Sequence, residues 1–163
     1  MMLRIAGPVV IAALVAAASA QAQVRSVKDI PTALAVEAAA AAVADCSSKG
    51  YYVSAAVVDR AGYIKALHRA DDAGPHSLES SRRKAYTALT LKTATTPLME
   101  MTQKFPAAAN LIYINDFLLL GGGIPIQVSG ETIGAIGVGG APGGHLDDQC
   151  AAAGIAKIKA RLN

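Results

Sequence analysis

Aromatic side chains and excess charge are both scarce in this sequence of 163 residues. Tryptophan is absent, and phenylalanine and tyrosine together make up 4% of the chain, too little for the stacking surface of a single-strand nucleic-acid binder. The 15 basic and 12 acidic residues leave a formal net charge of +3, and no run of the chain is strongly basic. We therefore expect no nucleic-acid partner.

The sequence patterns that mark common catalytic sites are also missing. There is no G-x-S-x-G nucleophile elbow, H-E-x-x-H zinc motif, C-x-x-C pair or Walker A loop. A hydrolase or metalloprotease would have to assemble its nucleophile, base and metal ligands without a local signature. Whether the protein is an enzyme stays open, and binding without turnover is the favoured expectation.

Long apolar runs are absent except at the start of the chain. There Arg4 precedes an apolar segment that ends in two A-x-A motifs, at Ala20 and Ala22. The run is too short to cross the ~30 Å hydrocarbon core as a helix, and the small residues fit cleavage after either alanine. We expect a signal peptide over 1–22, one mature domain over 23–163, no membrane span, and a periplasmic or secreted location.

Cysteine occurs only twice, as Cys46 and Cys150. In an exported protein such a pair can form a disulfide, and closing a loop of ~100 residues stabilises by up to ~4.7 kcal/mol in the chain-entropy model. The alternative is two buried free thiols that pack as small hydrophobes. We predict the bridge, because the ends of a compact domain often lie close together.

The rest of the chain alternates between helix and strand signals. Helices are expected over 32–48, from a Ser77 cap to Lys92, from a Thr96 cap to Phe105, and over 146–161. Strands are expected over 52–59, 63–69, 124–128 and 131–138, whereas 111–120 gives no clear signal. Short turns at 60–62 and 129–130 predict two β-hairpins.

A glycine-rich segment, 137–144, follows a strand and precedes a helix, as a phosphate-binding loop does. However, Pro142 occupies the position of the third glycine, and no later strand completes a βαβ unit. Asp147 and Asp148 in the first helical turn would complement the helix dipole themselves and repel a phosphate. We expect these glycines to permit close backbone packing.

Three segments resemble the GlcG/HbpS-type haem-binding family, which also includes the C-terminal domain of PduO-type cobalamin adenosyltransferases. They are GGGIPIQVSGETIGAIGVGGAPGGHLDD from Gly121, VVDRAGYIKALHRADDA over 57–73 and SRRKAYTAL over 81–89. The chain departs from the family at Ala70 and Asp72, where Met and Gly are common.

This resemblance implies a single α/β (α+β) domain with an antiparallel sheet flanked by helices, in a profilin-like layered architecture. It also implies a homo-oligomer, and binding of haem or a related tetrapyrrole, as in some exported members of the family.

Histidine supplies the candidate iron ligands. His76 lies where a helix is expected to start, with Arg82 and Arg83 one to two turns further on, which suits an iron ligand with partners for the haem propionates. We therefore assign His76 as the metal ligand and place both arginines and His145 in the cofactor site. His68 alternates with other residues on one strand face, which favours a packed or rim position.

Three functions remain after these steps. The first is an exported haem-binding protein that stores, buffers or presents haem without turnover. The second is a small-molecule or corrinoid-binding, enzyme-related domain in which Arg69, Asp71 and Asp72 hold a polar ligand. The third is an oligomeric interaction domain without a ligand. A Soret band on adding haem separates the first from the others.

Overall fold

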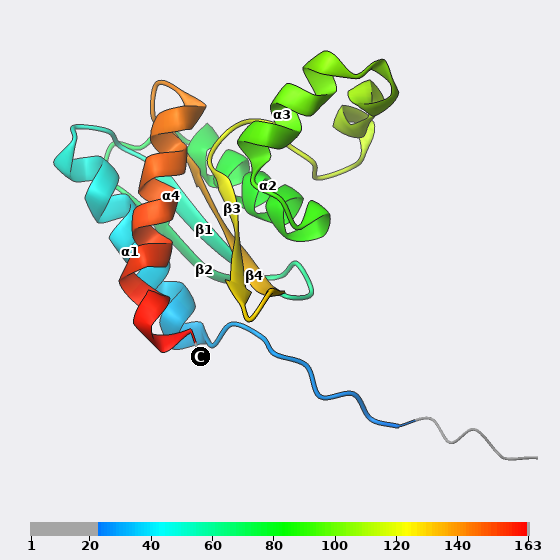
Figure 1. The fold of residues 1–163 in the computed structure, drawn as a ribbon. Coiled ribbons are helices and arrows are strands. Elements are labelled where there is room, and N and C mark those ends of the chain that lie inside the picture. Colours follow the sequence, from blue (N-terminus) through cyan, green and yellow to red (C-terminus); the bar gives the residue numbers. More distant parts are fainter. Residues whose placement is uncertain (1–22, 163) are drawn as a thin grey trace, which may run out of the picture.

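The computed structural model describes residues 23–162, so the expected signal peptide over 1–22 lies outside the described residues. One four-stranded sheet carries helices on both faces (Figure 1), which confirms the predicted mixed α/β single domain. The elements are α1 (Thr32–Ser48), β1 (Ser54–Asp59), β2 (Ile64–Arg69), α2 (His76–Leu91), α3 (Thr95–Lys104), the 3-10 helix η1 (Pro106–Tyr113), β3 (Gly123–Val128), β4 (Glu131–Gly139), α4 (Gly144–Ile158) and the 3-10 helix η2 (Lys159–Arg161).

The sheet has the strand order β2-β1-β4-β3, and every neighbouring pair is antiparallel. Both predicted hairpins are present, as β1–β2 and β3–β4. A bulge shifts the register of the first hairpin, so that Ile64 pairs with Val58 whereas Ala66 pairs with Val57. The sequence predicts that every second residue of this strand, including Ile64, Ala66 and His68, lies on one face. This is wrong for Ile64, because the bulge places it on the face opposite to Ala66 and His68.

Helices α1 and α4 lie side by side on one face of the sheet (Figure 1). Small residues bring them close: a Cβ built on Gly154 of α4 would lie 2.5 Å from the Ala38 carbonyl oxygen of α1. A disulfide joins Cys46 of α1 to Cys150 of α4, with their Cα atoms 5.5 Å apart. This confirms the predicted bridge and removes the alternative of two free thiols.

Helix α2 covers the other face of the sheet, and it too depends on a glycine. A Cβ built on Gly137 of β4 would lie 2.1 Å from the Ser81 carbonyl oxygen of α2. Glycine at this position therefore lets the helix rest directly on the strand, which confirms the expectation that the glycine-rich segment serves close packing.

Beyond α2, the short helices α3 and η1 project from the body of the domain (Figure 1). The chain then returns through residues 114–120, which we call the strap. Its Leu118 amide donates a hydrogen bond to Thr87 Oγ1 at 2.8 Å, and its Phe117 ring meets the Tyr86 ring edge-on, with centroids 6.3 Å apart. The strap thus lies across α2, and it accounts for much of the region without a clear sequence signal.

Three helices begin earlier than predicted. Neither Ser77 nor Thr96, the two residues expected to cap a helix, is a helix cap in the structure. Ser77 lies within α2, where its hydroxyl donates to the Gly74 carbonyl at 2.6 Å. Thr96 lies within α3, and its hydroxyl donates to the Asp148 carboxylate. Helix α4 begins at Gly144 rather than at residue 146. Within residues 23–162, no helix is both long and apolar enough for a bilayer crossing.

Candidate functional site

Three elements meet at the end of the sheet where β1 begins. Ser54, the first residue of β1, pairs with Arg69 at the end of β2 and with Gly139 at the end of β4. Helix α2 starts at the same end of the sheet, since Ser77 Oγ lies 2.8 Å from Ser54 Oγ. Helix α4 starts at Gly144, shortly after β4 ends. Two helix starts and the glycine-rich segment thus share one end of the domain.

All three histidines of the chain lie at this end, which we call the histidine end. His68 is the penultimate residue of β2, His76 is the first residue of α2, and His145 is the second residue of α4. Each side chain is exposed, and none makes a hydrogen bond or ion pair with another described residue. Their ring nitrogens are therefore available to an external ligand.

The ring of His76 folds back over the loop that precedes α2. A Cβ built on Gly74 would lie 2.7 Å from His76 Cε1, so the ring occupies the space that a side chain at position 74 would need. The absence of a side chain at Gly74 leaves room for this conformation. The imidazole is thus held near the domain surface without being buried.

Arg82 and Arg83 already have partners from the strap. Arg82 forms ion pairs with Glu79 and Asp116, each at 2.6 Å, and these carboxylates raise the pKa of the guanidinium. Arg83 donates to the Phe117 carbonyl, while its Nε is buried without a hydrogen-bond partner. Both arginines therefore hold the strap against α2.

Three of the four predicted cofactor residues, His76, Arg82 and Arg83, lie on α2. Arg82 and Arg83 follow His76 by six and seven residues, which corresponds to about 9–10 Å along a helix axis. His145 belongs to a different helix. Arg82 would have to exchange its present carboxylate partners to bind a propionate.

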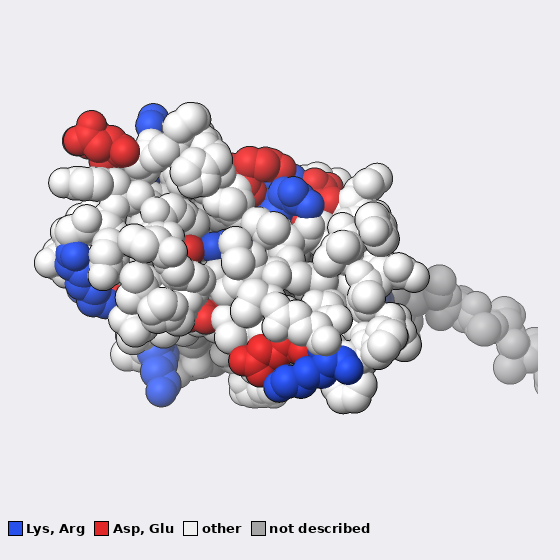
Figure 2. Space-filling view, turned by 90° about the horizontal axis from the view of Figure 1, so that it is seen from above, with Lys and Arg blue, Asp and Glu red and all other residues white. Residues whose placement is uncertain are grey.

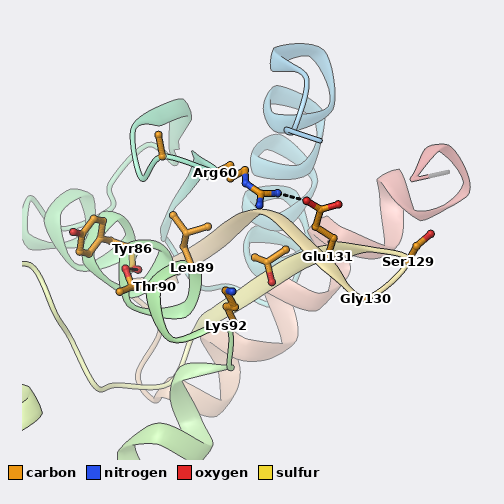
Figure 3. Close-up of a pocket in the computed structure, with 10 residues that line it drawn as sticks. Arg60, Tyr86, Leu89, Thr90, Lys92, Ser129, Gly130 and Glu131 are labelled. Atoms are coloured by element: carbon orange, nitrogen blue, oxygen red, sulfur yellow. Dashed lines mark hydrogen bonds and ion pairs between the residues drawn. The ribbon is translucent and has the colours of Figure 1, made fainter. Parts of the chain in front are cut away.

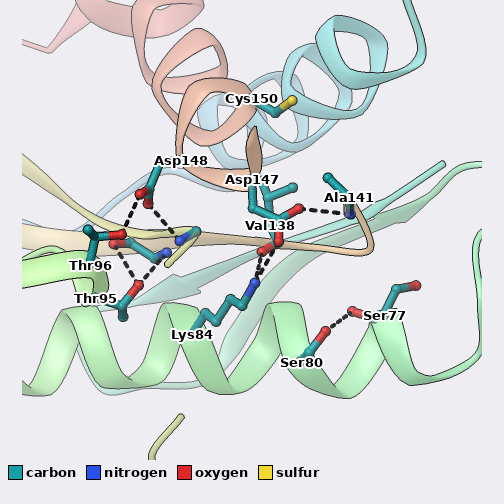
Figure 4. Close-up of polar contacts among 12 residues, drawn as sticks. Ser77, Ser80, Lys84, Thr95, Thr96, Val138, Ala141, Asp147, Asp148 and Cys150 are labelled. Atoms are coloured by element: carbon teal, nitrogen blue, oxygen red, sulfur yellow. Dashed lines mark hydrogen bonds and ion pairs between the residues drawn. The ribbon is translucent and has the colours of Figure 1, made fainter. Parts of the chain in front are cut away.

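A buried ion pair that the sequence analysis missed holds the glycine-rich segment in place (Figure 4). Lys84 Nζ of α2 lies 2.7 Å from Asp147 Oδ2 and 2.9 Å from the Val138 carbonyl oxygen. Asp147 Oδ1 accepts a hydrogen bond from the Ala141 amide at 3.1 Å. Burial raises the pKa of Asp147, although the charge of Lys84 opposes this shift.

Asp148 makes a second link, because Oδ1 accepts a hydrogen bond from the Gly122 amide at 2.6 Å. Asp147 lies in the first turn of α4, as expected, and both aspartates in addition fix neighbouring segments. One sequence signal could have identified Lys84: it lies beside Ala85 and four residues before Ala88, on the apolar face of α2.

The histidine end also has a small polar hollow with a volume of about 320 Å³. His68 and Tyr52 line it together with Arg69 and Asp71. Of the three residues proposed for a polar ligand, the structure thus brings Arg69 and Asp71 together, whereas Asp72 does not line the hollow. His68 lines the hollow and is exposed, so of the two predicted positions, packed or rim, the packed one is wrong.

Figure 2 looks down on this end of the molecule from above the view of Figure 1. White atoms, which mark all residues other than Lys, Arg, Asp and Glu, cover most of the surface, and the charged side chains stand singly or in small groups. No large field of one sign dominates this face.

No group of three or more His, Cys, Asp or Glu side chains between residues 23 and 162 is arranged to hold a metal ion. This finding matters less for haem than for a bare ion, because the porphyrin supplies most of the iron ligands. A single imidazole such as that of His76 is enough to complete an axial position.

Known proteins resemble this chain over most of its length. GlcG of Escherichia coli strain K12 is 36% identical over 101 residues, which cover 61% of this chain and 72% of that protein. A 15.0 kDa protein of Citrobacter freundii is also 36% identical, but the aligned part spans only 61% of that protein's length.

Solved structures share the fold. A variant of Streptomyces reticuli HbpS is 39% identical with a TM-score of 0.78, covering 86% of this chain and 97% of that one. A PduOC:heme complex is 27% identical with a TM-score of 0.71, covering 80% and 95%. The family model described as "Haem degrading protein HbpS-like" matches residues 30–156. The chain therefore belongs to the HbpS-like family.

Proposed function

We propose that this protein is an exported haem-binding protein that stores, buffers or presents haem, and that it acts as a homo-oligomer. The observation that carries the proposal is the exposed, unpartnered imidazole of His76 at the start of α2, with His68 and His145 at the same end of the domain. The family description and the haem in the complex of the PduOC relative support the choice of ligand.

In this proposal His76 would hold the haem through its iron. Its ring lies at the surface over Gly74, so a planar ligand can approach without displacing core residues. The proposal also assigns His145, at the start of α4, to this site. Haem would supply the redox-active iron, whereas the protein would supply an imidazole that binds the iron and the surface on which the haem lies.

The propionates are assigned to Arg82 and Arg83. Arginine binds carboxylates through two parallel hydrogen bonds, and Arg82 already does so with Glu79 in this structure, at 3.0 and 2.6 Å. A propionate would take the place of Glu79 or Asp116, both of which lie near the surface.

Binding without turnover is the part of the proposal that needs its own measurement, because the family description names haem degradation. The absorbance of bound haem should persist in the presence of a reductant and oxygen as long as that of haem bound to an inert histidine-containing protein. Faster bleaching, with a product of altered spectrum, would assign degradation to the protein.

The central experiment is a titration of the purified domain with ferric haem, followed by the Soret band. We expect saturable binding, and His76→Ala should weaken it more than His68→Ala or His145→Ala does. The latter two variants are matched controls, since each removes an exposed histidine from the same end. Equal titrations for all three variants and the parent would show that the iron ligand is a different residue.

Export and assembly have separate tests. The intact mass of exported protein should begin at Gln21 or Gln23, and a secreted form that retains Met1 would contradict the signal peptide. Sedimentation should show a species larger than a monomer at micromolar protein. A clean species of about 14–15 kDa, the mass of one domain of this length, would contradict a homo-oligomer.

A second candidate function rests on the polar hollow beside His68. Its Arg69 and Asp71 side chains could hold a small polar molecule or an edge of a corrinoid. Titration with cobalamin tests this candidate: a saturable spectral change that is lost in His68→Ala but kept in His76→Ala would favour it over haem binding.

A further inference from the structure

A second cavity lies at the end of the sheet opposite to the histidine end. It has a volume of about 550 Å³ and is formed by the β1–β2 turn, the β3–β4 turn and the last turn of α2 (Figure 3). Six residues of β1 separate the two ends, which corresponds to about 17–20 Å. A ligand in this cavity would therefore not contact the histidines.

Two cationic side chains reach this cavity from different elements. Lys92 ends α2 in the left-handed conformation, with φ of +52°, and its side chain points toward the cavity in Figure 3. Arg60 enters from the β1–β2 turn. Within the described residues Lys92 has no ion pair or hydrogen bond through its ammonium group, whereas Arg60 pairs with Glu131.

Two side chains with large apolar surfaces form part of the wall beside these charges. Tyr86 and Leu89 of α2 line it, and Gly62 of the β1–β2 turn packs against both. A Cβ built on Gly62 would lie 2.9 Å from the Tyr86 ring, so the turn fixes the ring in place. The hydroxyl groups of Thr90 and Thr132 complete the lining.

From this lining we infer a binding site for a small organic anion that carries an apolar body and one oxyanion, either a carboxylate or a phosphate monoester. The apolar body packs on Tyr86 and Leu89, and the oxyanion meets Lys92 and the guanidinium of Arg60. This site is separate from the proposed haem site and does not depend on it.

Glu131 gives the site an internal competitor. Its carboxylate forms an ion pair with the Arg60 guanidinium, and the oxyanion of the ligand would have to replace it there. The ion pair is partly exposed on both sides, so exchanging one carboxylate for another costs little. Removing the Glu131 charge should therefore strengthen binding, whereas removing the Lys92 charge should weaken it.

The test uses the purified domain and four probes followed by amide chemical shifts in NMR. Benzoate and phenyl phosphate share a ring and differ in the oxyanion, inorganic phosphate lacks the ring, and benzylamine carries the opposite charge. We expect benzoate or phenyl phosphate to bind with a dissociation constant of about 1 mM or below. Their shifts should map to 86–92 and 129–132, and the stronger of the two identifies the oxyanion.

Two variants with opposite expected effects make the test specific. Lys92→Asn removes the ammonium charge and introduces a residue that tolerates the left-handed conformation, so it should weaken binding by about tenfold. Glu131→Gln should strengthen binding by about threefold. Lys157→Gln, on the exposed side of α4, is the control and should leave binding unchanged.

Several results would overturn the inference. One is equal binding of benzylamine and benzoate, which would indicate an apolar contact alone. Another is shift changes scattered over the surface, or Lys92→Asn and Glu131→Gln changing affinity in the same direction. Displacement of benzoate by stoichiometric haem would show that the cavity is not a separate site, whereas a failed haem titration would leave this inference intact.

Discussion

Lys84 and Asp147 form an ion pair inside the domain although 63 residues separate them in the chain, with 2.7 Å between Nζ and Oδ2. Both residues are almost completely buried, at 1% and 2% exposure. The lysine comes from the helix on one face of the sheet and the aspartate from a helix on the other face. The pair therefore ties the two helical layers together at the edge of the glycine-rich segment.

Removing the lysine should be strongly destabilising. Lys84→Met leaves the buried carboxylate of Asp147 without its countercharge, which costs about 3–5 kcal/mol at neutral pH. Replacing both residues, as Lys84→Met with Asp147→Leu, should cost less than the single change. Urea unfolding of the two variants and the parent measures this, and additive losses would contradict a coupled pair.

The loss in Lys84→Met should depend on pH. Burial raises the pKa of Asp147 and Lys84 lowers it, so without the lysine the folded pKa rises further above the ordinary value of 3.8. A raised folded pKa contributes stability that is present below 3.8 and lost as the pH rises through the folded value.

The deficit of this variant relative to the parent should therefore grow from acid toward neutral pH. Unfolding midpoints across this range provide the measurement. A deficit that shrinks as the pH rises would show that the carboxylate is solvated once the lysine is removed.

Loss of the disulfide should weaken the fold without changing its architecture. The bridge from Cys46 to Cys150 spans a sequence separation of 104, and removing a bridge of this kind costs about 2–5 kcal/mol. The double variant Cys46→Ala with Cys150→Ala should unfold at lower urea but keep its circular dichroism spectrum. Identical midpoints for oxidised parent and variant would contradict a contribution from the bridge.

Gly137 should not accept even one additional carbon atom. An alanine there would place Cβ 2.1 Å from the Ser81 carbonyl oxygen, and overpacking of this kind costs about 1–3 kcal/mol or more. The matched control is Gly130→Asn in the β3–β4 turn, where no heavy atom lies within 4 Å of the new Cβ and asparagine tolerates the positive φ. Thermal unfolding should separate the two variants clearly.

Arg82 and Arg83 provide a test of the propionate assignment. Replacing both with alanine should weaken haem binding by about 1–3 kcal/mol and make the remaining affinity less sensitive to salt. Since these arginines also hold the strap, the unfolding free energy of the apo variant must be measured beside the titration. Affinity equal to that of the parent would remove them from the site.

Local patterns were enough to predict the strands and both hairpins. The β3–β4 turn is one case, because Ser129 and Gly130 both adopt positive φ, as a two-residue hairpin turn requires. The bulge beside Val57 could not be predicted in this way, since it depends on how two strands pair rather than on either sequence alone.

The candidate site was less predictable for a similar reason. His76 stands out in the sequence because it opens a helix, and the structure leaves it exposed as expected. Arg82 has one local partner, Glu79. Its second partner, Asp116, and the partner of Arg83, the Phe117 carbonyl, come from the strap, more than thirty residues later, where the sequence shows no periodic pattern. The apolar face of α2 marks Lys84 as a buried residue, but its partner Asp147 lies 63 positions away and no local pattern connects the two.

The Cys46–Cys150 bridge also determines how the domain responds to mechanical load. The covalent loop that it closes contains all four strands, from Ser54 to Gly139, together with α2 and α3. Tension applied to the two chain ends passes from α1 to α4 through the sulfur atoms, so it can extend only the segments outside the loop. While the bridge is intact, the sheet and the two proposed binding sites at its ends are shielded from pulling force.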